Sequence, residues 1–202
     1  MRGRPKADAA EQEKKRHDVR LALMGLLEQT PSQDLNASLL ISQLAVSRPT
    51  FYKWYPGGLE QVMNELLDNL YAPLISGLHE SIRNHEDPLQ MAEQAVRTYY
   101  GWVRALGSFA LCIFREVENP DSVFAVKRLQ ILRQMRDDFE ATMASRQIAQ
   151  RQQTNLAALT QAVISVLRAS VRDGLPAGAL DSNEELLRHI VLAGMQKTLG
   201  AS

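Results

Sequence analysis

Residues 45–58 read AVSRPTFYKWYPGG and carry four aromatic side chains within residues 51–55, beside an arginine, a lysine and several hydroxyl groups. Arginine and lysine donate hydrogen bonds to base edges and phosphates, and serine, threonine and tyrosine hydroxyls bind phosphate oxygens. The Pro-Gly-Gly at residues 56–58 ends any helix that reaches it. These residue types could recognise DNA if a short helix exposes them on one face.

Residues for catalysis are not grouped in this way. The glycines form no phosphate-binding loop, and no serine nucleophile motif is present. Cys112, the single cysteine, has no histidine near it in the chain and is expected to be a small buried residue of a reducing cytosol. His79 and His85 are six positions apart and do not share a helix face, and His17 and His189 lie far from them. We therefore expect no enzyme, no metal site and no cofactor.

Apolar residues recur at spacings of three and four throughout the chain, which predicts an all-α fold of about nine helices. Asp87-Pro88 and Asn119-Pro120 are typical helix starts, and residues 182–185 (SNEE) form a capping box. A loop is expected at residues 173–180 (DGLPAGAL). The predicted helices span residues 13–29, 37–44, 48–54, 59–84, 88–106, 108–117, 121–150, 153–173 and 182–199.

The two short helices at 37–44 and 48–54 predict a helix-turn-helix. Ser47 would cap the second helix, and Phe51 and Tyr55, four positions apart, would share its buried face. The other face would expose Arg48, Pro49, Tyr52 and Lys53, and such a helix can lie in the DNA major groove. The alternative is a short aromatic helix that only packs inside a bundle.

Residues 39–62 (LLISQLAVSRPTFYKWYPGGLEQV) resemble the DNA-binding signature of the TetR (tetracycline repressor) family of bacterial regulators. The resemblance lies in a valine-serine pair followed by two aromatic pairs, here Val46-Ser47, Phe51-Tyr52 and Trp54-Tyr55. This chain has Ala45 where the family usually has a glycine, Trp54 in place of a histidine, and Gly58 in place of a lysine that opens the fourth helix. The resemblance implies a DNA-binding domain at 13–58 and a larger ligand-sensing and dimerisation domain at 59–202.

Residues 1–12 are expected to form a flexible basic arm, because residues 1–20 carry seven basic and four acidic side chains. The RGRPK at residues 2–6 resembles the core of AT-hook segments, whose arginines enter the narrow minor groove of A·T-rich DNA. A merely solubilising arm is the alternative. The predicted DNA-binding residues are Arg2, Arg4, Lys6, Asn36, Ser47, Arg48, Pro49, Thr50, Tyr52, Lys53 and Trp54.

The C-terminal domain has two expected binding surfaces. Aromatic and methionine residues on its middle helices could line a small-molecule cavity, although such stripes are also typical of plain core. The candidates are Tyr99, Tyr100, Val103, Phe109, Ile113, Met135 and Phe139. The last two helices are apolar over more than half of their circumference, which predicts a homodimer. The expected interface residues are Leu156, Leu159, Val163, Val166, Leu187, Ile190, Val191 and Gly194.

The formal net charge is zero, so any affinity for DNA must come from local charge. The basic start followed by residues 21–27 (LALMGLL) is not a signal peptide, and no apolar run approaches a membrane span, so a cytoplasmic protein is expected. The resemblance to the TetR family implies a repressor that binds a palindromic operator as a homodimer and is released by a small molecule. The alternative is an architectural or partner-recruiting DNA-binding protein of the same fold that senses no small molecule.

Overall fold

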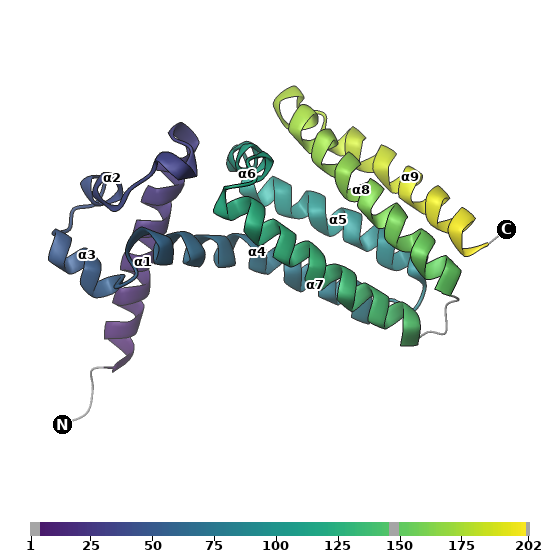
Figure 1. Ribbon diagram of the computed structural model, residues 1–202, viewed down its shortest axis with the longest axis horizontal. Helices are drawn as coiled ribbons and strands as arrows, with labels where there is room; N and C mark the ends of the chain where they lie inside the picture. Colours follow the sequence, from purple (N-terminus) through teal and green to yellow (C-terminus); the bar gives the residue numbers. More distant parts are fainter. Residues whose placement is uncertain (1–4, 146–149, 201–202) are drawn as a thin grey trace. The chain divides into compact units, whose positions relative to one another are not determined.

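The computed structural model describes residues 5–145 and 150–200, and in them the chain is all-helical, as predicted (Figure 1). The described residues fold into nine α-helices and one 3₁₀ turn, in two compact units. The helices are α1 (Pro5–Gln29), η1 (Ser32–Asp34, the 3₁₀ turn), α2 (Ala37–Ser42), α3 (Arg48–Trp54), α4 (Gly58–Asn84), α5 (Pro88–Leu106), α6 (Phe109–Glu118), α7 (Val123–Ser145), α8 (Gln150–Ala177) and α9 (Leu180–Leu199). None of these helices combines the length and the apolar character that a membrane crossing requires.

The N-terminal unit comprises the described residues up to Leu70 together with residues 121–123. Its core is made by apolar side chains of α1, α2, α3 and the first part of α4, all of them almost fully buried. They include Val19, Leu23, Leu27, Leu40, Phe51, Tyr55, Val62 and Leu66. The i, i+4 spacing of Val19, Leu23 and Leu27 keeps one side of α1 against this core.

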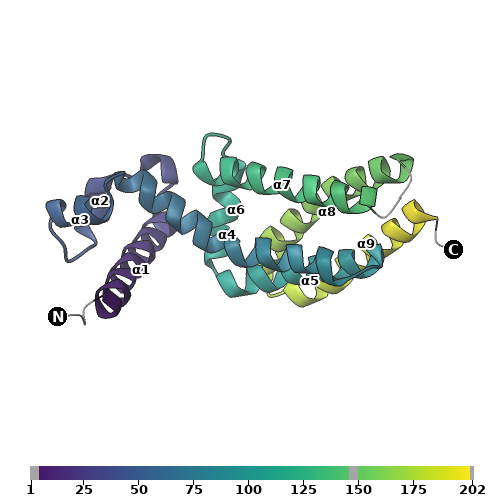
Figure 2. The same cartoon turned by 90° about the horizontal axis from the view of Figure 1, so that it is seen from below.

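The C-terminal unit contains α4 from Tyr71 onward, α5, α6, α8, α9 and α7 from Phe124 onward. Helix α9 lies alongside both α5 and α8 (Figures 1 and 2). Two arginines tie α9 to α5: Arg104 pairs with Asp181 and Glu184 at 2.5 and 2.6 Å, and Arg188 pairs with Glu93 at 2.5 Å. Because these ion pairs are partly solvated, they fix the register of the two helices more than they stabilise them.

Several predicted boundaries are wrong, while α3 and α5 begin and end as predicted. Residues 5–12, predicted as part of a flexible arm, are helical, because Pro5 can occupy a first helical turn and the alanines at 7, 9 and 10 favour helix. The predicted loop at 173–180 is mostly helical too: α8 runs to Ala177 and ends before Gly178, whose φ of +67° suits glycine. The predicted capping box at Ser182 lies inside α9, where its hydroxyl donates to the Ala179 carbonyl.

The division between the units also differs from the predicted one. It falls between Leu70 and Tyr71, inside α4, rather than after residue 58. The Pro-Gly-Gly at 56–58 is a turn between two helices of the same unit, because the first part of α4 packs Val62 and Leu66 into the N-terminal core. Gly58 takes a φ of +64° at this turn, which a residue with a Cβ rarely adopts.

Candidate nucleic-acid interface and effector cavity

Helices α2 and α3 are short and are joined by only residues 43–47. A side-chain cap starts each of them: the Asn36 side chain accepts a hydrogen bond from the Leu39 amide at 3.0 Å, and Ser47 accepts one from the Thr50 amide at 3.3 Å. Pro49 fits the first turn of α3, where no backbone donor is required. The local sequence thus fixes where α3 begins and which way its side chains face.

Helix α3 has one buried and one exposed face. Phe51 and Tyr55 have 0% exposure and their ring centroids lie 5.6 Å apart, which confirms the predicted anchoring pair. Tyr52 stays 42% exposed although its ring meets the edge of Phe51. The other exposed side chains of the helix are Arg48, Pro49 and Lys53, and Thr50 is partly exposed. Buried aromatic anchors therefore hold a row of polar side chains at the surface.

Arg48 donates a hydrogen bond to the Ser38 hydroxyl at 2.6 Å, which links α3 to α2. Ser47 and Thr50 share a hydroxyl contact at 2.8 Å. All four side chains are at the surface, so these contacts can be exchanged for phosphate oxygens or base edges. Residues 35–59 contain two basic and no acidic side chain, so no carboxylate from this segment opposes a polyanion there.

Trp54 and Asn36, both predicted to bind DNA, have structural roles in this unit. The ammonium group of Lys15 lies 5.8 Å from the centroid of the Trp54 ring, and Arg16 approaches the Trp54 carbonyl at 3.5 Å. Asn36 uses its side-chain oxygen to cap α2. Arg2 and Arg4 lie outside the described residues, and Lys6 lies in α1 but its side chain is outside the described part.

A charge cluster that the sequence analysis missed locks α3 against α1 and α4. Arg16 pairs with Glu65 at 3.0 Å, and its guanidinium lies 5.4 Å from the centroid of the Tyr55 ring. Arg20 is 8% exposed and pairs with Glu13 at 2.6 Å. Burial, with the Glu65 carboxylate nearby, raises the pKa of Tyr55 to about 12. The residues concerned are far apart in sequence, so their spacing gives no sign of this cluster.

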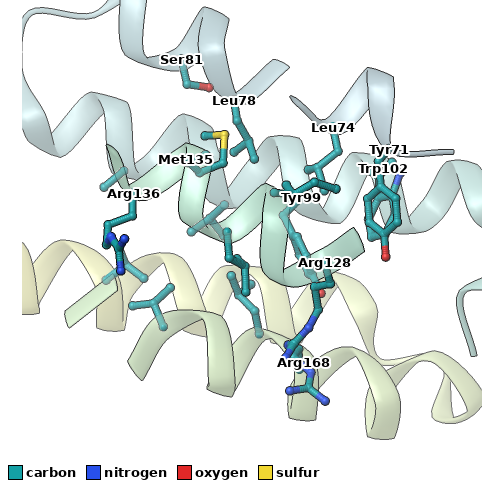
Figure 3. Close-up of a pocket in the computed structure, with 18 of the residues that line it drawn as sticks. Tyr71, Leu74, Leu78, Ser81, Tyr99, Trp102, Arg128, Met135, Arg136 and Arg168 are labelled. Atoms are coloured by element: carbon teal, nitrogen blue, oxygen red, sulfur yellow. The ribbon is translucent and has the colours of Figure 1, made fainter. Parts of the chain in front are cut away.

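The C-terminal unit contains a partly open cavity of about 240 Å³ whose walls come from α4 to α9 (Figure 3). Of the predicted cavity residues, Tyr99, Ile113 and Met135 line it. Tyr100, Val103 and Phe109 do not; they are buried in the core of the unit, so their assignment to the cavity is wrong. The side chain of Phe139 lies outside the described part.

The wall of the cavity is mostly apolar, and its polar groups are few. Tyr71 and Trp102 stack with ring centroids 5.4 Å apart, and Tyr99 lies 5.8 Å from Trp102. Burial raises the pKa of Tyr71 to about 12 and raises that of Tyr99 as well, so both are neutral phenols. Arg128, Arg136 and Arg168 also line the cavity, and none of the three was predicted.

Tyr99 and Tyr100 are adjacent in sequence, but Tyr100 belongs to the core and Tyr99 to the cavity wall. Two substitutions test this difference. Tyr100 is fully buried and its hydroxyl lies 2.7 Å from the Ser170 hydroxyl, whereas Tyr99 lines the cavity. Tyr100→Phe should lower the free energy of unfolding by about 1 kcal/mol, because Ser170 loses its buried partner. Tyr99→Phe, the matched control, should change it by less than about 0.5 kcal/mol. Urea unfolding followed by circular dichroism measures both, and equal losses would contradict the distinction.

The predicted dimer residues fall into two groups. Leu187 and Val191 are 2% and 4% exposed, and Val163 and Val191 line the cavity, so assigning these three to an interface is wrong. They belong to the side of α8 or α9 that covers the chain's own core. Val166 and Ile190 are 46% and 49% exposed, and Leu186, which was not predicted, is 60% exposed. Gly194 is partly exposed, and the side chains of Leu156 and Leu159 lie outside the described part.

Within residues 5–145 and 150–200, no group of three or more histidine, cysteine, aspartate or glutamate side chains could hold a metal ion. Cys112 is buried, as expected. No model of a protein family, no curated protein and no solved structure matches the chain. The function proposed below therefore rests on this chain's own residues.

Proposed function

We propose that this protein is a DNA-binding transcriptional regulator of the TetR type, a repressor that binds a palindromic operator as a homodimer in the cytoplasm. The observation that carries the proposal is the division of α3: Phe51 and Tyr55 are fully buried, while Arg48, Tyr52 and Lys53 stay exposed. Exposed cations and hydroxyls on a short capped helix, in a segment without carboxylates, suit insertion into a major groove.

Two further features support regulation rather than mere attachment to DNA. Exposed Val166, Leu186 and Ile190 give α8 and α9 an apolar surface suited to a second copy of the chain. The cavity in the C-terminal unit is large enough for a small organic molecule, whose binding would favour one arrangement of the two DNA-reading units over another. A repressor released by a small molecule needs all three features: the exposed face of α3, the apolar surface for a second copy, and the cavity.

Selection from a pool of random duplexes tests the proposal. The purified protein should enrich an inverted repeat whose half-sites are separated by about one helical turn, roughly 10 base pairs, or a multiple of it. Both copies of α3 can then meet the major groove on one face of the duplex. Enrichment of no sequence, with equal affinity for all duplexes, would contradict the regulator and favour an architectural DNA-binding protein of the same fold.

A further inference from the structure

Arg128 of α7 and Arg168 of α8 meet at the wall of the cavity. Burial lowers the pKa of Arg128, and the nearby charge of Arg168 lowers it further. Figure 3 draws both beside Tyr99, whereas Arg136 lies apart from them. The arginine side chain stays charged even when its pKa falls, so this part of the cavity wall holds two like charges.

The Nε atoms of Arg128 and Arg168 are buried and form no hydrogen bond. No carboxylate is among the described groups that shift the pKa of Arg128. Other arginines of this unit are paired with carboxylates: Arg104, Arg172 and Arg188 each have one within 3.3 Å. Two like charges held close together, with part of each guanidinium buried, are unfavourable unless something compensates them.

The groups around Arg128 and Arg168 indicate what kind of ligand could neutralise the two charges. Tyr71, Tyr99 and Trp102 form an aromatic cluster, and the electrostatic influence of Arg128 on both tyrosines shows that the cluster borders the pair. The two tyrosine hydroxyls are neutral, because burial raises the pKa of each, and they can donate a hydrogen bond to an anion. Beyond them the wall is formed by aliphatic residues and Met135.

We propose that the cavity binds an amphipathic organic anion: its acidic group pairs with Arg128 and Arg168, and its apolar body lies against the aromatic and aliphatic wall. A carboxylate can accept parallel hydrogen bonds from a guanidinium, and such charge-assisted bonds are strong away from water. This assignment rests on the proposed function only in taking the anion as the effector; the binding site itself does not depend on DNA binding.

Binding is tested with two carboxylates and their neutral, isosteric amides, using isothermal titration calorimetry on the full chain without DNA. The probes are decanoate with decanamide, and naphthalene-2-carboxylate with naphthalene-2-carboxamide, so that aliphatic and aromatic bodies are distinguished. At least one carboxylate should bind about tenfold or more tightly than its amide, because only the acid forms charge-assisted bonds. Equal affinities within both pairs would overturn the proposal.

Variants locate the acidic group. Arg128→Gln with Arg168→Gln should abolish the preference for acid over amide and leave amide binding within about threefold, while Arg128→Lys should retain part of the preference. The matched control is Arg136→Gln, because Arg136 lines the same cavity but pairs with Asp137 at 3.1 Å. Loss of the preference in Arg136→Gln, or its survival in the double variant, would overturn the assignment.

The melting temperature of the free protein provides a second test, which needs no ligand. Removing one of two neighbouring like charges should raise the melting temperature of the free protein for Arg128→Gln and for Arg168→Gln, and the wild-type chain should gain stability when the carboxylate is added. A fall in melting temperature on both substitutions would mean that the arginines support the fold, against the proposal. Carboxylate binding that leaves an operator complex intact would preserve this site and refute the effector role alone.

Discussion

Replacing Arg48 with alanine should weaken binding to the selected operator by about 1–3 kcal/mol and relax the preference at one base position. Arg48 is exposed in the first turn of α3 and is the only arginine of that helix, so it is the side chain best able to pair with a guanine edge. The fold should not suffer, because the helix is anchored by Phe51 and Tyr55. Fluorescence anisotropy with operator and scrambled duplexes measures both effects.

Two controls separate base recognition from other roles of Arg48. Arg83→Ala removes the same charge from an exposed position in the last turn of α4, and should weaken binding to both duplexes little and equally. Ser38→Ala removes the hydroxyl that Arg48 contacts at 2.6 Å and should change operator affinity less than threefold. If Ser38→Ala lowers operator affinity as much as Arg48→Ala does, Arg48 acts by holding α2 against α3 and not by contacting a base. An unchanged operator-to-scrambled ratio in Arg48→Ala would also refute base recognition.

The short helix at the centre of the candidate interface could be predicted from sequence because local chemistry determines it. Ser47 caps its start, Pro49 fits its first turn, and the glycines at 57 and 58 follow its end, so helix α3 spans the predicted residues 48–54. The spacing of Phe51 and Tyr55 then predicts their shared buried face. Each of these signals acts over at most one helical turn.

Features that depend on packing between distant helices could not be predicted. An arginine on an amphipathic helix ordinarily faces solvent, so nothing in the sequence distinguishes Arg128 and Arg168 from other arginines before α7 and α8 meet. Tyr99 and Tyr100 are adjacent aromatic residues, yet only one of them borders the cavity. Helix α8 carries two apolar stripes, and the sequence does not show which of them faces the core. The structure gives Val163 to the cavity and leaves Val166 exposed.

The apolar surface on α8 and α9 leads to the prediction with the largest expected effect. Leu186 and Ile190 are four positions apart on α9, and both are about half exposed or more, at 60% and 49%. Residues at this spacing lie on the same side of a helix, and Val166 adds an exposed apolar side chain on α8, which packs along α9. In a homodimer this surface would be covered by its counterpart on the second copy, as an isologous interface requires.

Leu186→Arg together with Ile190→Arg should therefore convert the dimer into a folded monomer, because the two charges would be buried at the interface but are solvated in the single chain. Operator affinity should fall about 100-fold or more, since two linked α3 helices bind a palindrome far better than one. Light scattering measures the mass, and circular dichroism checks that the helices persist. The control is Leu129→Arg, which places a charge at an apolar residue of α7 with a similar exposure of 46%. A wild-type monomer at micromolar concentration, a double variant that remains dimeric, or a control that dissociates instead would each remove this interface from the proposed function.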